Sequence, residues 1–146
     1  MKYYAGIGSR NTPVRILKAM EQVAKFLSKK GYILRSDSAD GSDKVFEKGC
    51  IGKKEIYLPW NNFNNNKSNL IVRNKRAFEI AEKYHPYFSR LSSGARLLQA
   101  RNSYQVLGKD LNTPSNFILC YTKGGKGSGG TGQAIRIAKA WTFYFI

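Results

Sequence analysis

The first third of the chain is the part that most restricts its fold. Residues 2–7 are apolar and β-prone, and they run into a glycine-containing turn at residues 6–10. From Val14 apolar residues recur at helical spacing as far as Leu27, and Gly31 is expected to end this helix. Residues 32–34 are again a short apolar segment. A strand, a helix and a strand in this order predict a βαβ unit, whose two strands must be parallel.

The same alternation continues along the chain. Further strands are predicted at residues 55–58, 116–121 and 142–146, and further helices ending near Gly49 and covering about 70–84, 92–107 and 133–141. Thr12 is expected to be the N-cap of the first helix and Pro13 its first residue. This pattern predicts an α/β fold, a Rossmann-like open parallel sheet with helices on both faces. We see no internal repeat and no domain boundary, and therefore expect a single Rossmann-like domain over residues 1–146.

Composition limits the class of protein. Hydrophobic residues make up 42% of the chain, enough for a core, but no apolar run approaches the about 20 residues of a membrane span. Cys50 and Cys120 have no CxxC spacing, so we expect buried free thiols in a reducing compartment. The single histidine, His85, is too little for a Cys/His zinc site or a Ser/His/Asp triad. We therefore expect a cytoplasmic protein with no membrane partner, no metal site and no cofactor.

Charge points to a polyanionic partner. The chain has 25 Lys and Arg against 9 Asp and Glu, a net charge of +16. Such a surface attracts nucleic acid, and an exposed Tyr or Trp60 would offer a face on which bases stack. The basic residues are spread over the whole chain, so a general role in solubility stays open as an alternative.

Three unusual loops each follow a predicted strand: residues 6–12, 35–43 and 122–132. Because the carboxyl ends of parallel strands meet at one edge of a sheet, we expect the three loops to gather there and form a ligand site. An Asn-rich stretch at residues 60–69 is predicted to be another loop, either a linker or a lid over that site.

The glycine-rich segment 124–132 carries the strongest sign of phosphate binding. It lies between a strand and a helix, where glycines and the N–H groups of the helix start favour an anion. It is neither a Walker A loop nor a strict GxGxxG motif. The predicted phosphate- or ligand-binding residues are Gly8, Ser9, Arg10, Ser36, Asp40, Arg101, Gly125, Gly129, Gly130 and Thr131.

Acidic residues cluster just after the second strand. Asp37, Asp40, Asp43 and Glu47 stand close together in an otherwise basic chain. They are either helix caps and first-turn acids, which helices prefer, or groups that bind sugar hydroxyls or polarise a glycosidic bond. Asp40, Asp43 and Glu47 are the candidate catalytic residues.

Several segments resemble the SLOG superfamily. Residues 5–13, 39–49 and 56–60, and further stretches at 91–96, 100–102 and 129–138, are similar to DprA/Smf-like proteins, above all to the small DprA-like proteins of phage genomes. The resemblance implies a nucleotide pocket, a homodimer or higher homo-oligomer, and a bacterial or phage-infected host cell.

The same resemblance bears on catalysis. LOG-type relatives cleave the N-glycosidic bond of nucleotides with an Arg and a Glu, but in this chain Ala134 stands at the position of that Glu. Asp37 interrupts the Ser-Gly-Gly that relatives usually carry, and Gln99 stands where a His is expected. These departures weaken a nucleotide hydrolase hypothesis, and whether the protein is an enzyme stays open.

Two functional hypotheses follow. The first is a nucleotide- or nucleotide-derivative-binding protein that sequesters or hydrolyses its ligand. The alternative is a DprA-like recombination and DNA-processing factor that binds single-stranded DNA. The salt dependence of binding separates them, because a strand loses affinity steeply with salt and a single nucleotide does not.

Overall fold

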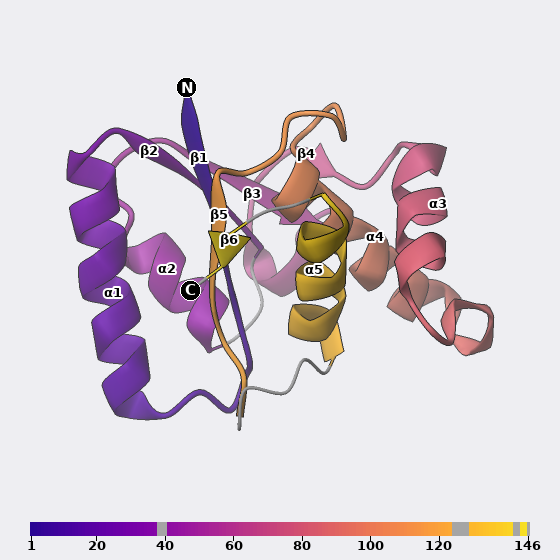
Figure 1. Ribbon diagram of the computed structural model, residues 1–146, viewed down its shortest axis with the longest axis horizontal. Helices are drawn as coiled ribbons and strands as arrows, with labels where there is room; N and C mark the ends of the chain where they lie inside the picture. Colours follow the sequence, from indigo (N-terminus) through magenta and orange to yellow (C-terminus); the bar gives the residue numbers. More distant parts are fainter. Residues whose placement is uncertain (38–40, 124–128, 142–143, 146) are drawn as a thin grey trace.

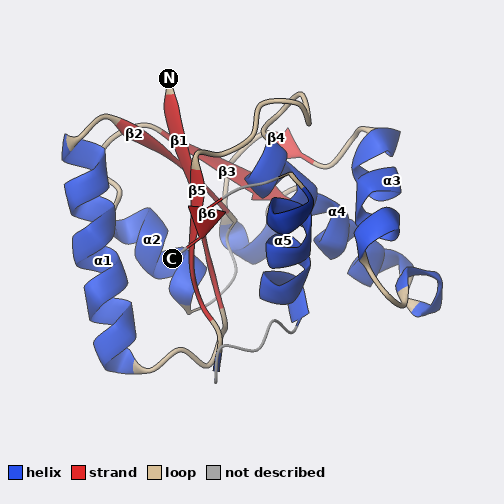
Figure 2. Cartoon of the chain, in the orientation of Figure 1, coloured by secondary structure: helices blue, strands red, loops and turns tan. Residues whose placement is uncertain are grey.

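The described residues of the computed structural model, 1–37, 41–123, 129–141 and 144–145, build a parallel sheet. Its strand order is β4-β3-β2-β1-β5-β6, and every neighbouring pair is parallel (Figures 1 and 2). The strands are β1 Lys2–Gly8, β2 Tyr32–Ser36, β3 Lys54–Leu58, β4 Leu70–Ile71, β5 Phe117–Tyr121 and β6 Tyr144–Phe145. The predicted Rossmann-like α/β class is confirmed.

Helices cover both faces of this sheet. They are α1 Val14–Lys29, α2 Ser42–Gly49, α3 Lys75–Tyr84, α4 Ser93–Leu107 and α5 Gly129–Ala140, with short 3-10 turns η1 Phe63–Asn65 and η2 Phe88–Arg90. Figure 1 shows α1 and α2 on one side of the strands and α3, α4 and α5 on the other. Within the described part of the chain, no helix has both the length and the apolar character needed to cross a membrane.

The central strand β1 explains why both faces are covered. Its Tyr4 packs in a cluster with Met20 of α1 and Phe46 of α2, whereas Ala5 and Ile7 belong to the cluster of α4 and α5. Alternate side chains of a strand point to opposite faces, so a strand buried on both faces reads as a continuous apolar run. This is why residues 2–7 stand out in the sequence.

The strand order creates a switch point beside β1. The chain builds β2, β3 and β4 on one side of β1 and then returns to place β5 on its other side. In open α/β sheets the crevice between two such strands, beyond their carboxyl ends, is where ligands bind.

Three local expectations were wrong. Leu70 and Ile71 are not the start of a helix: they pair with Tyr57 and Leu58 of β3, because this edge pairing outweighs a helix-like spacing of apolar residues. The helix begins after Asn74, whose side chain caps it by accepting a hydrogen bond from the Arg76 N–H at 2.9 Å. Likewise α5 begins at Gly129 and not at residue 133, which places four glycine-loop residues in its first turn.

The third concerns Thr12, which does not cap α1. Pro13 occupies that position, and its carbonyl accepts hydrogen bonds from the N–H groups of Ile16 and Leu17. The Thr12 hydroxyl instead donates to the Ser9 carbonyl at 2.7 Å and lies 2.6 Å from the Ser42 hydroxyl. Thr12 therefore ties the turn after β1 to the start of α2.

Candidate functional site

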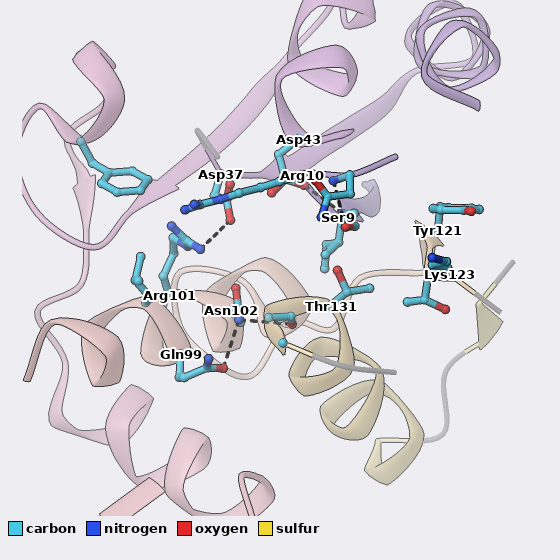
Figure 3. Close-up of a pocket in the computed structure, with 18 of the residues that line it drawn as sticks. Ser9, Arg10, Asp37, Asp43, Gln99, Arg101, Asn102, Tyr121, Lys123 and Thr131 are labelled. Atoms are coloured by element: carbon cyan, nitrogen blue, oxygen red, sulfur yellow. Dashed lines mark hydrogen bonds and ion pairs between the residues drawn. The ribbon is translucent and has the colours of Figure 1, made fainter. Parts of the chain in front are cut away.

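A cavity of about 790 Å³ opens at the carboxyl edge of the sheet, between the ends of β1 and β5 (Figure 3). The described parts of all three predicted loops contribute to its wall, as expected. Additional wall comes from α4 and from η1. Its polar and aromatic lining includes Ser9, Arg10, Asp37, Asp43, Phe63, Gln99, Arg101, Asn102, Tyr121, Lys123 and Thr131.

Arg101 of α4 is the most informative residue of the cavity. Its Nη2 donates to Asp37 Oδ2 at 2.9 Å, and only 7% of its side chain is exposed. The Nε and Nη1 atoms are buried and have no hydrogen-bond partner among the described residues. Leaving a buried charged donor without an acceptor costs free energy. An acceptor supplied by a bound ligand would remove this cost.

Two carboxyl groups lie behind Arg101. Asp43 is almost fully buried, accepts a hydrogen bond from the Gly8 N–H at 3.1 Å, and shares a hydrogen bond with Asp37. Burial, followed by the charge of Asp37, raises the pKa of Asp43 well above its ordinary value, while Arg101 and the Gly8 N–H act against this rise. The positive charge of Arg101 faces this pair and offsets part of its negative charge. The repulsion that an anion meets here is therefore reduced.

The amino end of α5 forms another wall of the cavity. Gly129, Gly130 and Thr131 line it, and the first N–H groups of a helix have no acceptor within the helix. The carbonyl of Gly130 accepts a hydrogen bond from Asn102 Nδ2 at 3.3 Å, which ties α5 to α4. Gly129 has a φ of +58°, a left-handed conformation that favours glycine. The helix dipole adds to the attraction for a phosphate.

Cationic side chains stand at the rim. Arg10 and Lys123 line the cavity and are exposed to solvent. The guanidinium of Arg101 also lies 5.5 Å from the centre of the Phe63 ring, and Trp60 packs edge-on against that ring at 5.2 Å. The cavity thus combines a positive rim, backbone donors and an aromatic edge.

The structure brings together most of the predicted site residues. Those that line the cavity are Gly8, Ser9, Arg10, Asp43, Arg101, Gly129, Gly130 and Thr131. Gly8 is required for packing as well, since a Cβ there would lie 2.2 Å from Ser42 Cβ and Oγ.

Two predicted residues lie elsewhere, and two cannot be placed. Ser36 is the last residue of β2, is fully buried, and donates to the Gly6 carbonyl at 2.7 Å. Glu47 faces a separate hollow, where its carboxylate is 3.7 Å from Lys54 Nζ. Asp40 and Gly125 lie outside the described residues.

Sequence reasoning left some lining residues out of the predicted set. Asp37, Asn102 and Phe63 are examples. From Ala100 to Leu107 every residue of α4 is buried, polar ones included, so the usual expectation that charged helical residues face solvent fails for Arg101. The signal available in the sequence was the position of Asp37, immediately after β2.

Comparison with known proteins places the fold. No model of a known protein family and no curated protein matches the chain. A solved structure that it resembles is DNA processing protein A from Helicobacter pylori, described for its single-stranded DNA binding mode, with a TM-score of 0.68 and 19% sequence identity. The match covers 99% of this chain but only 63% of that protein. At this level of identity the likeness concerns architecture, and the chain shares the fold of that part of DNA processing protein A.

Proposed function

We propose that the cavity binds single-stranded DNA, with a phosphate and its adjoining nucleotide entering between β1 and β5. The observation that carries this proposal is Arg101, whose two buried nitrogen atoms at the cavity wall find no acceptor within the part of the chain that the structure describes. A phosphate oxygen or a base acceptor would satisfy them, and guanidinium groups are suited to such contacts.

Charge and aromatic side chains extend the argument from one phosphate to a strand. Arg10 and Lys123 at the rim, within a chain of net charge +16, favour a polyanion over a single small anion. Phe63 and the 42% exposed Trp60 provide faces for unpaired bases, which a duplex keeps stacked inside. The resemblance in fold to a protein described as binding single-stranded DNA supports the same conclusion.

The wider assignment we propose is a DprA-like DNA-processing protein of the SLOG superfamily. It rests on the fold and on the segments quoted from the sequence. We also propose that the protein is of the small, phage-encoded kind and forms a homodimer or higher homo-oligomer.

A free nucleotide is the second candidate ligand. The depth of the cavity favours it, because Arg101 and Thr131 in its wall are each only 6% exposed. These two residues would contact a single nucleotide, with no need for a longer DNA strand. Ala134 is fully buried in α5 and absent from the lining. Among the described residues, the carboxyl groups that line the cavity are those of Asp37 and Asp43.

Fluorescence anisotropy separates the two candidates. The probes are labelled oligo(dT) of about 16 nucleotides, the upper size of known single-strand sites, a duplex of the same length, and unlabelled dTMP as competitor. We expect the single strand to bind more tightly than the duplex, with affinity that falls steeply with salt. Arg10→Gln should weaken binding more than Lys109→Gln, which removes another exposed charge, at the opposite edge of the sheet. Tight dTMP binding with little salt dependence would overturn the proposal.

A further inference from the structure

We infer that a second hollow beside the cavity holds the next part of the same DNA strand, an inference that rests on the proposed function. This hollow, of about 560 Å³, is lined by Lys44, Glu47, Lys48, Cys50, Lys54 and Asn64–Asn66 and is called the lysine hollow below. Its predicted partner is the sugar–phosphate backbone beyond the nucleotide bound in the cavity.

The linings of the two hollows adjoin in sequence at two places. On α2 the cavity is lined by Asp43 and the lysine hollow by the following residue, Lys44. On η1 the cavity is lined by Phe63 and the lysine hollow by the following residue, Asn64. Consecutive Cα atoms are about 3.8 Å apart, so the two linings come close to each other on both α2 and η1.

Charge makes the lysine hollow suitable for phosphate. Lys44, Lys48 and Lys54 are all exposed, against one lining carboxylate, Glu47. Lys54 is 3.7 Å from Glu47, and Lys48 is 3.8 Å from Glu21. Ion pairs this exposed contribute little free energy, so Lys48 and Lys54 can turn to a phosphate at small cost. Asn66 Nδ2 donates to Glu47 at 3.3 Å, which engages that carboxylate within the wall.

The border itself carries an aromatic ring. Phe63 stands on it between Arg101 on the cavity side and Trp60, whose ring meets it edge-on. A base stacked at this border would leave its two flanking phosphates on either side, one toward the cavity and one toward the lysines. Alternating phosphate and base contacts of this kind are how single-strand grooves bind without sequence preference.

The test compares a short and a long oligonucleotide in two variants of equal charge. The first carries Lys44→Gln, Lys48→Gln and Lys54→Gln. The control carries Lys29→Gln, Lys30→Gln and Lys109→Gln, three exposed lysines at the amino edge of the sheet. Binding of oligo(dT) of about 4 and about 16 nucleotides is measured over a series of salt concentrations. Thermal melting confirms that both variants fold.

For the long oligonucleotide, we expect the first variant to reduce the slope of log K against log salt by about 2, because each phosphate contact to a single strand contributes about 0.7. Its affinity for the short oligonucleotide should match that of the control. A further variant, Lys48→Glu, changes one highly exposed side chain and should lower the affinity for the long oligonucleotide only.

The possible results test the lysine hollow separately from the proposed function. If Arg10→Gln weakens binding but the lysine variant keeps the wild-type slope, or loses no more than the control, the lysine hollow is not a subsite and the proposed function stands. If the unmodified protein does not prefer a single strand, both fall together.

Discussion

Arg101→Lys separates the binding role of this side chain from its structural role. In the folded protein one guanidinium nitrogen, Nη2, holds Asp37 at 2.9 Å, while Nε and Nη1 have no acceptor among the described residues. A lysine can keep the positive charge beside the carboxyl pair of Asp37 and Asp43. It has no nitrogen atoms in the place of Nε and Nη1, so it loses the donors that we assign to the ligand.

The size of the effect follows from this geometry. A hydrogen bond to a charged group contributes about 1.5–3 kcal/mol, so losing one such bond to a phosphate weakens affinity about 10- to 150-fold. The charge beside Asp37 is kept, so the melting temperature should change by no more than about 4 °C. Arg101→Met, in contrast, leaves the buried carboxyl pair without a cation and should cost about 3–5 kcal/mol of stability.

The assay is anisotropy with labelled oligo(dT), together with thermal melting. The matched control is Arg35→Lys, at a buried arginine outside the cavity that donates to Glu55, the Thr113 carbonyl and Ser115. This control should melt at a lower temperature yet bind DNA as the unmodified protein does. The reasoning is refuted if Arg101→Lys binds with unchanged affinity, or if its loss is no larger than that of Arg35→Lys.

Three further predictions concern other parts of the site. Gly8→Ala places a Cβ 2.2 Å from Ser42 Cβ and should lower the free energy of unfolding, measured in urea, by about 1–3 kcal/mol. Adding Ser42→Gly removes the clash and should restore part of this loss. Asp43→Asn should stabilise the protein at neutral pH and less so near pH 3.8. Folding raises the pKa of Asp43, so the unmodified protein loses stability as the pH rises above 3.8, by about 1.4 kcal/mol for each unit of that rise in pKa, and the Asn variant avoids this loss. Urea unfolding of both proteins at the two pH values checks this, and equal stability differences at both would contradict it. Trp60→Ala should weaken single-strand binding by about 1–3 kcal/mol, measured by anisotropy, whereas Tyr87→Ala, at another exposed ring, should not.

The fold was predictable because its signals are local. The apolar run of β1, the helical spacing after Val14 and the glycine at position 31 each depend on a few neighbouring residues. β4 was missed because it has only two residues, and what makes them a strand is their pairing with β3. No pattern within so short a segment distinguishes it from the start of a helix.

The candidate site was predictable only where strands end. The rule that loops after parallel strands share one edge predicted Ser9, Arg10 and Thr131 at this edge, and all three line the cavity there. The pairing of Asp37 with Arg101 was not predictable, because it requires knowing that α4 is buried on every side in its second half. Glu47 shows the opposite failure: it is close to Asp43 in sequence but one helical turn further, where it faces the lysine hollow.

The position of β1 in the middle of the sheet has a consequence for synthesis on the ribosome. Tyr3 exchanges hydrogen bonds with Asn116, 113 residues later, and β5 follows directly. Until that segment emerges, β1 has one neighbour and an unpaired edge open to other chains. The nascent protein likewise lacks the α5 wall of its cavity until residues 129–140 have been translated, so the cavity is complete only after that segment.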